Sequence, residues 1–485
     1  MDEETIIDDQ DELINPNRPR LRYIDYYMRP NCFQLSKRYT LVILIHMGFF
    51  IIFAMRSDLC FFDNEVFLEM YNDTENDTAR TFHKIYDIEY DMNASFFLAY
   101  LLVQIPAAIL SYKFPAQRVF GICILASSIM AIVQAFTLNW VTFEFGYAAF
   151  FQGLVQSASI PAVHGILYNW VTPTERATLS TLAYSGSFTG VCFGVAFSSL
   201  TCKLFEAEHL FAIYGIAGII WFLVWIWLVF ERPEVHPTIA DSEFEYLKRH
   251  IHVPKIKPPI PWRKIFSSSP CWALFVIYLC RSFNPYYLFQ ADYTQFNYVL
   301  FHMTAVGLEI PSAIMTIAVP ATGYLADQIS SKTSLSITNI RKYYICGGLF
   351  FEILTYIPGL LLEEDSIPYL INNRVMDIIF YSFTISGYYV NHLDIAPIYA
   401  CVTMCIGNLF GSLLGAFMSF GGGSHKTFGN KYIFYYMTGF HLFGIIFYGI
   451  WGSGEVQPWA KTKEDENQHE QNSTTSRQNS VENPK

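Results

Sequence analysis

Long apolar stretches recur throughout this chain, and three of the clearest are RYTLVILIHMGFFIIFAM, RVFGICILASSIMAIVQAF and LFAIYGIAGIIWFLVWIWLVF. Each is close to the roughly 20 residues that an α-helix needs to cross the hydrocarbon core of a bilayer. They do not alternate between apolar and polar residues, as the strands of a membrane barrel would. Only 15% of the residues are charged, whereas a soluble domain usually carries about 25%. The sequence therefore predicts an all-α membrane protein whose surface largely faces lipid.

The hydropathy of the sequence predicts about twelve transmembrane helices. In the first half they run near 39–60, 91–112, 118–137, 143–168, 178–200 and 209–230, and in the second near 271–291, 303–326, 341–362, 368–393, 399–420 and 431–452. The predicted units are a tail at 1–38, a six-helix half at 39–231, a polar linker at 232–269, a second six-helix half at 270–452 and a disordered tail at 453–485. Two such halves joined by a linker are the arrangement of the major facilitator fold, in which the substrate site lies between the halves near the midplane of the membrane.

Basic residues mark one side of the predicted bundle. They gather in the leading segment, the middle linker and the loop before the ninth span, so the positive-inside rule places these regions and both termini in the cytosol. The members are Arg18, Arg20, Arg22, Arg29, Lys37, Arg38, Lys248, Arg249, Lys255, Lys257, Arg263, Lys264, Lys332, Arg341 and Lys342.

The acidic loop at 61–91 falls on the opposite side. Two sequons make Asn72 and Asn76 candidate glycosylation sites there, although such short motifs also arise by chance. Cys60 and Cys202 lie at helix ends on the same side and are a candidate disulfide pair, which sequence alone does not decide. Most of the other cysteines lie inside apolar stretches and are expected to be small buried side chains.

Two arginines lie inside predicted spans, Arg56 in the first helix of its half and Arg281 in the first helix of the other. A charge at such a position costs about 2.5–3.5 kcal/mol on insertion scales, so it marks a functional site by default. The planar fork of arginine binds a carboxylate through two hydrogen bonds. Arg56 and Arg281 are therefore candidate ligands of a small organic anion, an internal ion pair or snorkelling being the structural alternative. Tyr100 and Tyr286 are candidate hydroxyl donors to the same substrate, or plain packing residues.

Four more ionisable residues are candidates for coupling or gating. Glu352 lies in the apolar run CGGLFFEILTYI and needs a partner, whether that partner is structural or part of coupling. His392 and Asp394, in NHLDIAP, are candidates for a gate or a proton relay, with a structural hydrogen-bonded pair as the alternative. Asp327, in GYLADQISSK, resembles the acidic position of the cytosolic loop motif of major facilitator proteins.

The sequence contains no constellation typical of an enzyme. GxxxxGK[ST], HExxH and a GxSxG between a strand and a helix are all absent. We therefore expect neither an enzyme nor an ATP-driven pump, and no metal, cofactor or nucleic acid. The candidate coupling ions are protons, sodium and chloride.

Segments from about residue 37 to 460 resemble, in order, those of one transporter family. They include SFFLAYLLVQIPA, HPTIADSE, CRSFNPYYL, NHLDIAP and SGEVQPWA. On these residues the chain resembles the anion–cation symporter family of the major facilitator superfamily, and in particular its vesicular glutamate transporters. The resemblance implies organic-anion transport driven by protons or membrane potential, or sodium-linked phosphate transport. It also implies that Arg56 and Arg281 hold the substrate carboxylates.

Three positions depart from the glutamate-transporting members of that family. Those members carry a histidine, an arginine and a proton-coupling glutamate where this chain has Asn93, Ala149 and Gln156. Neither Asn nor Gln titrates near neutral pH, so Gln156 leaves no proton acceptor at that position. Ile398 also stands where the group usually has arginine. The identity of the substrate and the coupling ion therefore stay open.

The first hypothesis is a secondary active transporter of small organic anions that takes up L-glutamate into synaptic or other secretory vesicles, driven by the membrane potential. One alternative is a sodium–phosphate or acidic-sugar (sialin-like) transporter of the plasma membrane or lysosome. Another is a divergent anion channel, or a scaffold without transport. The expected partners are glutamate and the lipid bilayer, with phosphate and chloride as further candidate ions.

Overall fold

A helix lies at each of the twelve predicted spans. The computed structural model describes Pro19, Arg22, Asp25 and residues 35–56, 78–137, 145–201, 207–251, 253–254, 256–282, 309–361, 367–420 and 430–461. The helices of the first half are α3 (Lys37–Arg56), α5 (Thr78–Lys113), α6 (Ala116–Thr137), α7 (Phe145–Gln156), α8 (Ser159–Trp170), α9 (Arg176–Thr201) and α10 (Ala207–Leu228). The helices of the second half are residues 269–282, α14 (Glu309–Lys332), α15 (Ile337–Leu361), α16 (Ile367–Ile395), α17 (Ala400–Phe420) and α18 (Asn430–Trp451). No strand occurs among these described residues, so the prediction of an all-α protein is confirmed.

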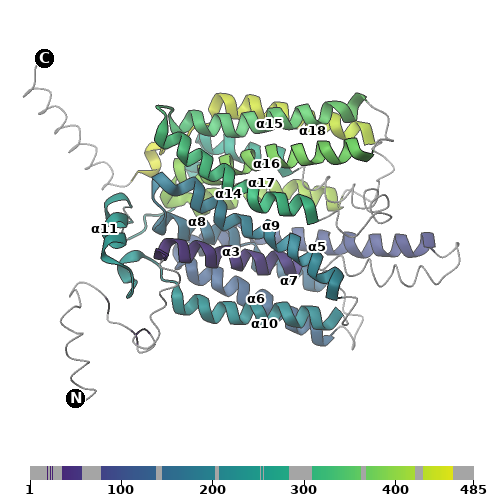
Figure 1. Ribbon diagram of the computed structural model, residues 1–485, viewed down its shortest axis with the longest axis horizontal. Coiled ribbons are helices and arrows are strands. Elements are labelled where there is room, and N and C mark those ends of the chain that lie inside the picture. The colour runs from purple at the N-terminus through teal and green to yellow at the C-terminus, as the bar shows by residue number, and fades with distance from the viewer. Residues whose placement is uncertain are drawn as a thin grey trace, which may run out of the picture.

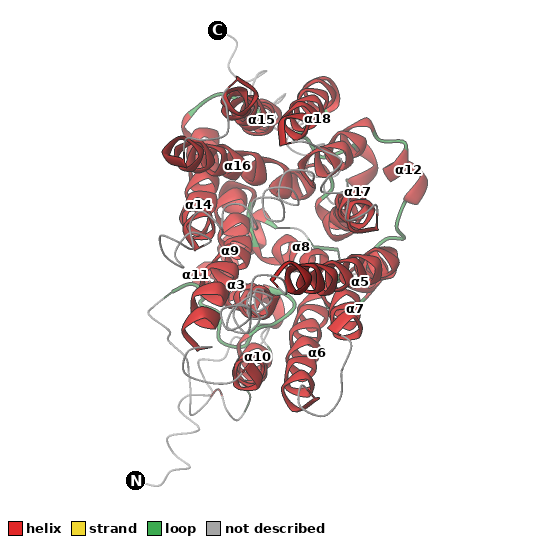
Figure 2. Ribbon diagram, turned by 90° about the vertical axis from the view of Figure 1, so that its right-hand side faces the viewer, coloured by secondary structure: helices red, strands yellow, loops and turns green. Residues whose placement is uncertain are grey.

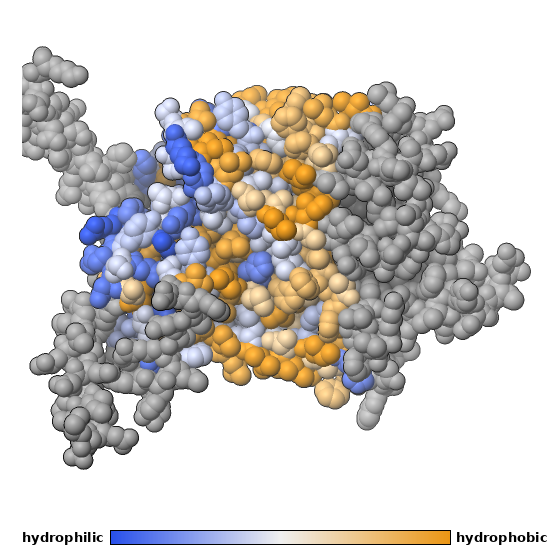
Figure 3. All heavy atoms as spheres, in the orientation of Figure 1, coloured by the Kyte–Doolittle hydropathy of each residue, from blue (hydrophilic) through white to orange (hydrophobic). Residues whose placement is uncertain are grey.

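The helices run side by side as one bundle (Figure 1). Viewed along the bundle, helices of the first half occupy one part and α14, α15, α16 and α18 the other, with α17 and α5 between them (Figure 2). Apolar side chains cover its flank and polar ones gather at one end (Figure 3). Four described segments are individually long and apolar enough to cross a membrane, namely Lys37–Arg56, Ser95–Lys113, Ala116–Phe136 and His209–Leu228, and the bent pair Met376–Ile395 and Pro397–Leu413 qualifies together.

The fourth predicted span is two helices, α7 and α8, which meet at residues 157–158. The hydroxyl of Ser157 donates to the Leu154 carbonyl at 2.8 Å, and that of Ser159 donates to the Gln156 carbonyl at 2.7 Å. Serines that hydrogen-bond nearby carbonyls compete with the helical pattern. Pro161 follows at once and has no N–H to donate to residue 157. The polar side chain of Gln156 is therefore placed at a break inside the bundle.

α5 begins at Thr78 and therefore extends before the span predicted near 91–112. Figure 1 shows this end of α5 extending beyond the other helices. Hydropathy finds the stretch that suits lipid, but a helix continues into polar sequence as long as its backbone can remain hydrogen-bonded.

The linker is folded against the bundle at the end where α3 begins (Figure 1), which we call the linker end. It contains α11 (Asp241–His250) and α12 (Trp262–Phe266). Glu243 of α11 accepts hydrogen bonds from the main-chain N–H groups of Lys37 and Arg38, at 2.8 and 3.1 Å. A carboxylate here satisfies two donors that the first turn of α3 leaves free.

The predicted start of the disordered C-terminal tail at 453 comes too early. A short 3₁₀ turn, η5 (Pro458–Ala460), packs at the linker end, and the Gln457 N–H donates to the Ile395 carbonyl at 2.8 Å. The Trp459 ring lies 5.9 Å from that of Tyr399. Aromatic packing and this hydrogen bond hold residues 453–461 against the bundle.

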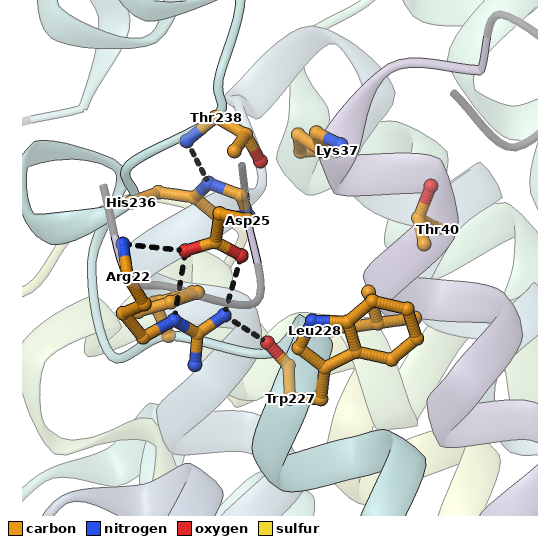
Figure 4. Close-up of a pocket in the computed structure, with 9 residues that line it drawn as sticks. Arg22, Asp25, Lys37, Thr40, Trp227, Leu228, His236 and Thr238 are labelled. Atoms are coloured by element: carbon orange, nitrogen blue, oxygen red, sulfur yellow. Dashed lines mark hydrogen bonds and ion pairs between the residues drawn. The ribbon is translucent and has the colours of Figure 1, made fainter. Parts of the chain in front are cut away.

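A pocket at the linker end joins the leading segment to the linker (Figure 4). Asp25 lies there between Arg22 and His236, and the Arg22 guanidinium also donates to the Trp227 carbonyl at 2.6 Å. Burial lowers the pKa of His236 to about 3, helped by the positive charges of Lys37 and Arg22. Burial opposes the ionisation of Asp25, but hydrogen bonds and charge from Arg22 outweigh it and lower the pKa of that carboxyl.

Five of the seven cysteines within the described segments are buried, as expected for small apolar side chains. Several predictions fall outside the described residues: the disulfide between Cys60 and Cys202, the sequons at Asn72 and Asn76, and the hydroxyl of Tyr286.

Candidate functional site

Arg281 is buried in the middle of a polar cluster in the second half, with 2% of its surface exposed. Its Nη1 donates to Oε2 of Glu352 on α15, and its guanidinium lies 3.8 Å from the ring centre of Tyr381 on α16. Glu352 also accepts from the hydroxyl of Thr384 at 2.9 Å. The helix at residues 269–282 thus meets α15, α16 and α18 here, and α18 contributes His441. The partner that Glu352 requires is Arg281.

His441 contacts both charged groups of the cluster. Its Nε2 lies 3.1 Å from Oε2 of Glu352 and 3.4 Å from Nη1 of Arg281, and its Nδ1 lies 2.7 Å from the Met437 carbonyl. The side chains of Glu352 and His441 are completely buried. A buried ion pair needs further hydrogen bonds to offset its desolvation, and Thr384 and His441 provide them.

The other edge of the Arg281 guanidinium has donors that are not used within the described part of the chain. Its Nε and Nη2 are buried and have no hydrogen-bond partner among the residues that the structure describes. These two N–H groups point the same way and form the edge that binds a carboxylate through two parallel hydrogen bonds. Leaving buried donors of a charged group unpaired is costly, so such donors indicate a missing partner. Arg281 can therefore keep Glu352 on Nη1 while it binds a substrate carboxylate on Nε and Nη2.

Arg56, the last residue of α3, is held by aromatic rings. Its guanidinium carbon lies 4.1 Å from the ring centre of Phe96 and 5.2 Å from that of Phe53. Phe96 stacks on Tyr100, with ring centres 5.7 Å apart. Among the described residues no carboxylate makes an ion pair with Arg56. Cation–π contacts with these rings position it.

Tyr100 connects the surroundings of Arg56 to the second half. Its hydroxyl accepts from the amide of Asn408 on α17 at 3.5 Å, and Ala149 packs into the same small cluster as Phe96. One turn along α5, the Cys405 thiol of α17 donates to the side-chain oxygen of Gln104 at 3.0 Å. α5 and α17 thus meet across the two halves through uncharged polar groups.

The positions that depart from the family pattern carry uncharged side chains, and two of them are buried in the described part of the chain. Gln156 is 2% exposed, and both its amide atoms lack a hydrogen-bond partner in the described part of the chain. Ala149 is buried beside Phe96. Asn93 lies on α5, and its side chain is outside what the structure describes.

Asp327 and Asp394 join the two halves at the linker end rather than lining the arginine cluster. Asp327 of α14 accepts from the N–H of Ala177 at 3.2 Å, and from the N–H and hydroxyl of Thr178, both at 2.7 Å. Asp394 of α16 accepts from Arg176 at 3.1 Å and from Arg341 at 2.6 Å. Both carboxylates of the second half therefore hold the beginning of α9 in the first half. We call these contacts the α9 clamp.

His392 is not paired with Asp394, because two residues apart on a helix face different directions. Its Nδ1 lies 3.0 Å from the Thr403 hydroxyl, and its ring lies 5.8 Å from that of His164 on α8. His164 contacts the Tyr389 carbonyl through Nε2 at 2.9 Å and the Tyr184 hydroxyl through Nδ1. These rings form a layer between the halves, which we call the aromatic layer; its members are His164, Tyr184, Tyr278, Tyr388, Tyr389 and His392.

The arginine cluster, the aromatic layer and the α9 clamp follow one another along α16. Tyr381 and Thr384 belong to the arginine cluster, through Arg281 and Glu352 respectively. Tyr389 and His392 belong to the aromatic layer, and Asp394 belongs to the clamp. A rise of about 1.5 Å per residue places Tyr381 about 20 Å from Asp394, so the arginine cluster lies deep in the bundle. The layer and the clamp separate it from the linker end in this conformation.

Sequence reasoning missed four residues of these clusters, His441, His164, Arg176 and the amide of Gln104. His164 and His441 interrupt apolar helical stretches, which is the same signal that marked Glu352. Arg176 follows directly after a helix break, where a basic residue carries no distinctive signal.

Comparisons with known proteins agree with this architecture. The family model described as Major Facilitator Superfamily matches residues 85–397. The proton:xylose symporter XylE, solved with 6-bromo-6-deoxy-D-glucose, superimposes with a TM-score of 0.64 over 87% of this chain and 97% of that chain, and at 10% identity it shows the fold alone. The predicted major facilitator fold is thereby confirmed.

Curated relatives narrow the assignment. Vesicular glutamate transporter 1 of Xenopus tropicalis is 35% identical over 459 residues, covering 89% of this chain and 78% of its own length. Vesicular glutamate transporter 2.1 of Danio rerio is 36% identical over 457 residues, covering 88% and 76%, and vesicular glutamate transporter 2 of Homo sapiens is 33% identical over 462 residues, covering 89% and 77%. The chain belongs to the major facilitator superfamily and, within it, to the family of the vesicular glutamate transporters. It is therefore a secondary transporter rather than an enzyme.

Proposed function

We propose that this protein takes up L-glutamate into secretory vesicles, driven by an inside-positive membrane potential, with Arg281 and Arg56 as the anion-binding residues. The observation that carries the proposal is the Nε and Nη2 edge of Arg281, which is buried and has no hydrogen-bond partner among the described residues. The names of the curated relatives support glutamate as the substrate and the vesicle as the compartment. Gln156 argues for the potential as the driving force, since it offers no proton acceptor there.

The direct test is uptake of labelled glutamate into sealed proteoliposomes, with an imposed inside-positive potential and no pH gradient. We expect saturable uptake that stops when the potential is dissipated. Conductance of chloride or phosphate without saturable glutamate uptake would instead indicate a divergent anion channel, and uptake that requires sodium would indicate a sodium-linked carrier.

Arg281→Ala should abolish glutamate uptake. Two hydrogen bonds to a charged group contribute about 1.5–3 kcal/mol each, so their loss weakens binding by a factor of roughly 100 or more. Arg281→Lys keeps the positive charge but loses the planar guanidinium with its two parallel N–H donors. We expect it to raise KM for glutamate about tenfold or more. Arg118, exposed on α6, provides a surface control, and Arg118→Ala should transport normally.

Removing Arg281 alone leaves Glu352 buried without its partner, which costs about 3–5 kcal/mol. The double variant Arg281→Ala with Glu352→Gln avoids this penalty. If the double variant is folded by size-exclusion chromatography and thermal unfolding yet transports glutamate with the wild-type KM, Arg281 does not bind the substrate.

A further inference from the structure

The hydrogen bonds of His441 fix which of its ring nitrogens carries a hydrogen. Nδ1 lies 2.7 Å from the Met437 carbonyl, which can only accept, so Nδ1 is the donor. In the neutral ring, Nε2 is then an acceptor. This Nε2 faces Oε2 of Glu352 at 3.1 Å, and an ionised carboxylate is also only an acceptor. The two atoms form a favourable contact only when a proton lies between them.

The Arg281 cluster therefore has two charge states. With a proton between Nε2 of His441 and Oε2 of Glu352, the positive charge of Arg281 makes the cluster net +1. Without it, Nε2 of His441 accepts from Nη1 of Arg281, 3.4 Å away, and the charges of Arg281 and Glu352 cancel to net zero. The proton belongs to the pair, because the two groups are in direct contact.

We propose that the proton shared by His441 and Glu352 sets the affinity of the Arg281 site for the substrate carboxylate. This inference rests on the proposed function, since it names the group that regulates that same site. With the proton present, an anion is attracted to a cluster of charge +1, and the loaded site is neutral. Without it, the anion approaches a neutral cluster in which Glu352 repels it at close range.

A resident proton is compatible with uptake driven by the membrane potential. If the proton stays on the pair throughout the cycle, the loaded site carries one positive charge fewer when it crosses than the empty site carries when it returns. One net charge then moves per glutamate, and an inside-positive potential favours the return of the empty site. The proton tunes the carrier but is not itself transported.

Other titratable groups surround the pair on each neighbouring helix. α15 contributes Tyr356, whose ring centre lies 5.5 Å from that of His441. α16 contributes Tyr381, over which Arg281 lies, and Asp377, which accepts from the Thr355 hydroxyl at 3.3 Å. Asp377 is a second carboxylate near the cluster, so its charge acts on the same pair.

The test measures glutamate binding to the purified full-length protein in nanodiscs by titration calorimetry, between pH 5.5 and 7.5. The carboxylates of glutamate stay ionised over this range, so its own charge does not produce a pH dependence. For wild type we expect Kd to rise with pH, by up to tenfold per unit once the pair has lost its proton. Repeating the titration in buffers of different ionisation enthalpy should show a proton taken up as glutamate binds.

Two variants should then behave in opposite ways. Glu352→Gln leaves Arg281 as the only charge, so it fixes the cluster at net +1 and should bind glutamate at pH 7.5 as tightly as wild type binds at pH 5.5. His441→Gln keeps a hydrogen-bonding side chain but takes up no proton, so it should bind weakly at every pH tested.

His46→Gln is a matched control, because His46 also contacts a main-chain carbonyl through Nδ1, that of Leu182 at 3.0 Å, and lies in the other half. It should keep the wild-type pH profile. Asp377→Asn should move the profile along the pH axis without flattening it.

The outcomes separate this inference from the proposed function. A wild-type protein that binds glutamate with the same Kd from pH 5.5 to 7.5, and without proton uptake, overturns the inference and leaves the transport function standing. A His441→Gln variant with the wild-type pH profile assigns the proton to another group and also overturns it. Absence of glutamate binding at every pH removes the proposed function and this inference with it.

Discussion

The α9 clamp predicts that neutralising Asp327 opens the linker end. Its carboxylate accepts three hydrogen bonds from Ala177 and Thr178, two of them from the N–H groups that begin α9. Asp327→Asn keeps the shape but replaces one oxygen with an NH₂ group that faces donors. α14 and α9 belong to different halves, so these bonds exist only while the linker end is closed.

The expected size follows from the bonds that the substitution removes. A hydrogen bond to a charged group contributes about 1.5–3 kcal/mol, and a charge at a helix N-terminus adds about 0.3–1 kcal/mol. Loss of one to two such bonds destabilises the closed conformation by about 3 kcal/mol. This corresponds to a shift of roughly 100-fold in the equilibrium between closed and open conformations.

Labelling of a cysteine at Thr181 measures that shift. Thr181 lies one turn beyond Ala177 on α9 and is 1% exposed, so a membrane-impermeant maleimide should reach Thr181→Cys only when the linker end opens. We expect Asp327→Asn to raise the labelling rate roughly 100-fold, and Glu234→Gln, at an exposed linker residue, to leave it unchanged. A labelling rate within twofold of the parent protein would show that the clamp does not hold this end closed.

Two further predictions concern Arg56 and the linker. Phe96→Leu removes the ring that lies 4.1 Å from the Arg56 guanidinium. A cation–π contact contributes about 1–2 kcal/mol, so KM for glutamate should rise roughly 5- to 30-fold in the proteoliposome assay. An unchanged KM would show that the ring does not position Arg56. His236 is neutral in the folded linker because burial lowers its pKa to about 3. The folded linker therefore binds fewer protons than the unfolded linker. Its free energy of unfolding should fall by about 1.4 kcal/mol per pH unit below about pH 6.5. Limited proteolysis of the linker between pH 7 and 4.5 measures this, and His236→Phe, between the rings of Trp170 and Phe230, should flatten the profile.

The spans could be predicted from the sequence because hydropathy is a local property of the chain. Within the described residues, every predicted span contains a helix, or a pair of helices in the case of α7 and α8. The break at 157–158 could not be predicted from hydropathy, because serine and alanine are tolerated inside a membrane helix. It depends on two hydroxyls that bond nearby carbonyls and on Pro161, whose effects are visible only in the backbone geometry.

The candidate site could be predicted only as separate residues. Arg281 and Glu352 were identified individually as charges in apolar surroundings, yet they are 71 positions apart, and His441 is 160 positions from Arg281. Their contact depends on how three helices are rotated toward one another, which the hydropathy of each helix does not specify. His392 and Asp394 show the converse, since neighbours in sequence bind different partners in the structure.

The two arginines differ in a way that the sequence alone does not reveal. Arg56 is positioned by aromatic rings, which leave its positive charge in place. Arg281 is paired with Glu352, so its effective charge depends on whether a proton is shared with His441. The attraction of an anion to Arg56 does not depend on the proton shared by His441 and Glu352. The affinity at Arg281 can change with pH, and this division would let a chain with Gln156 in place of an acid still respond to protons.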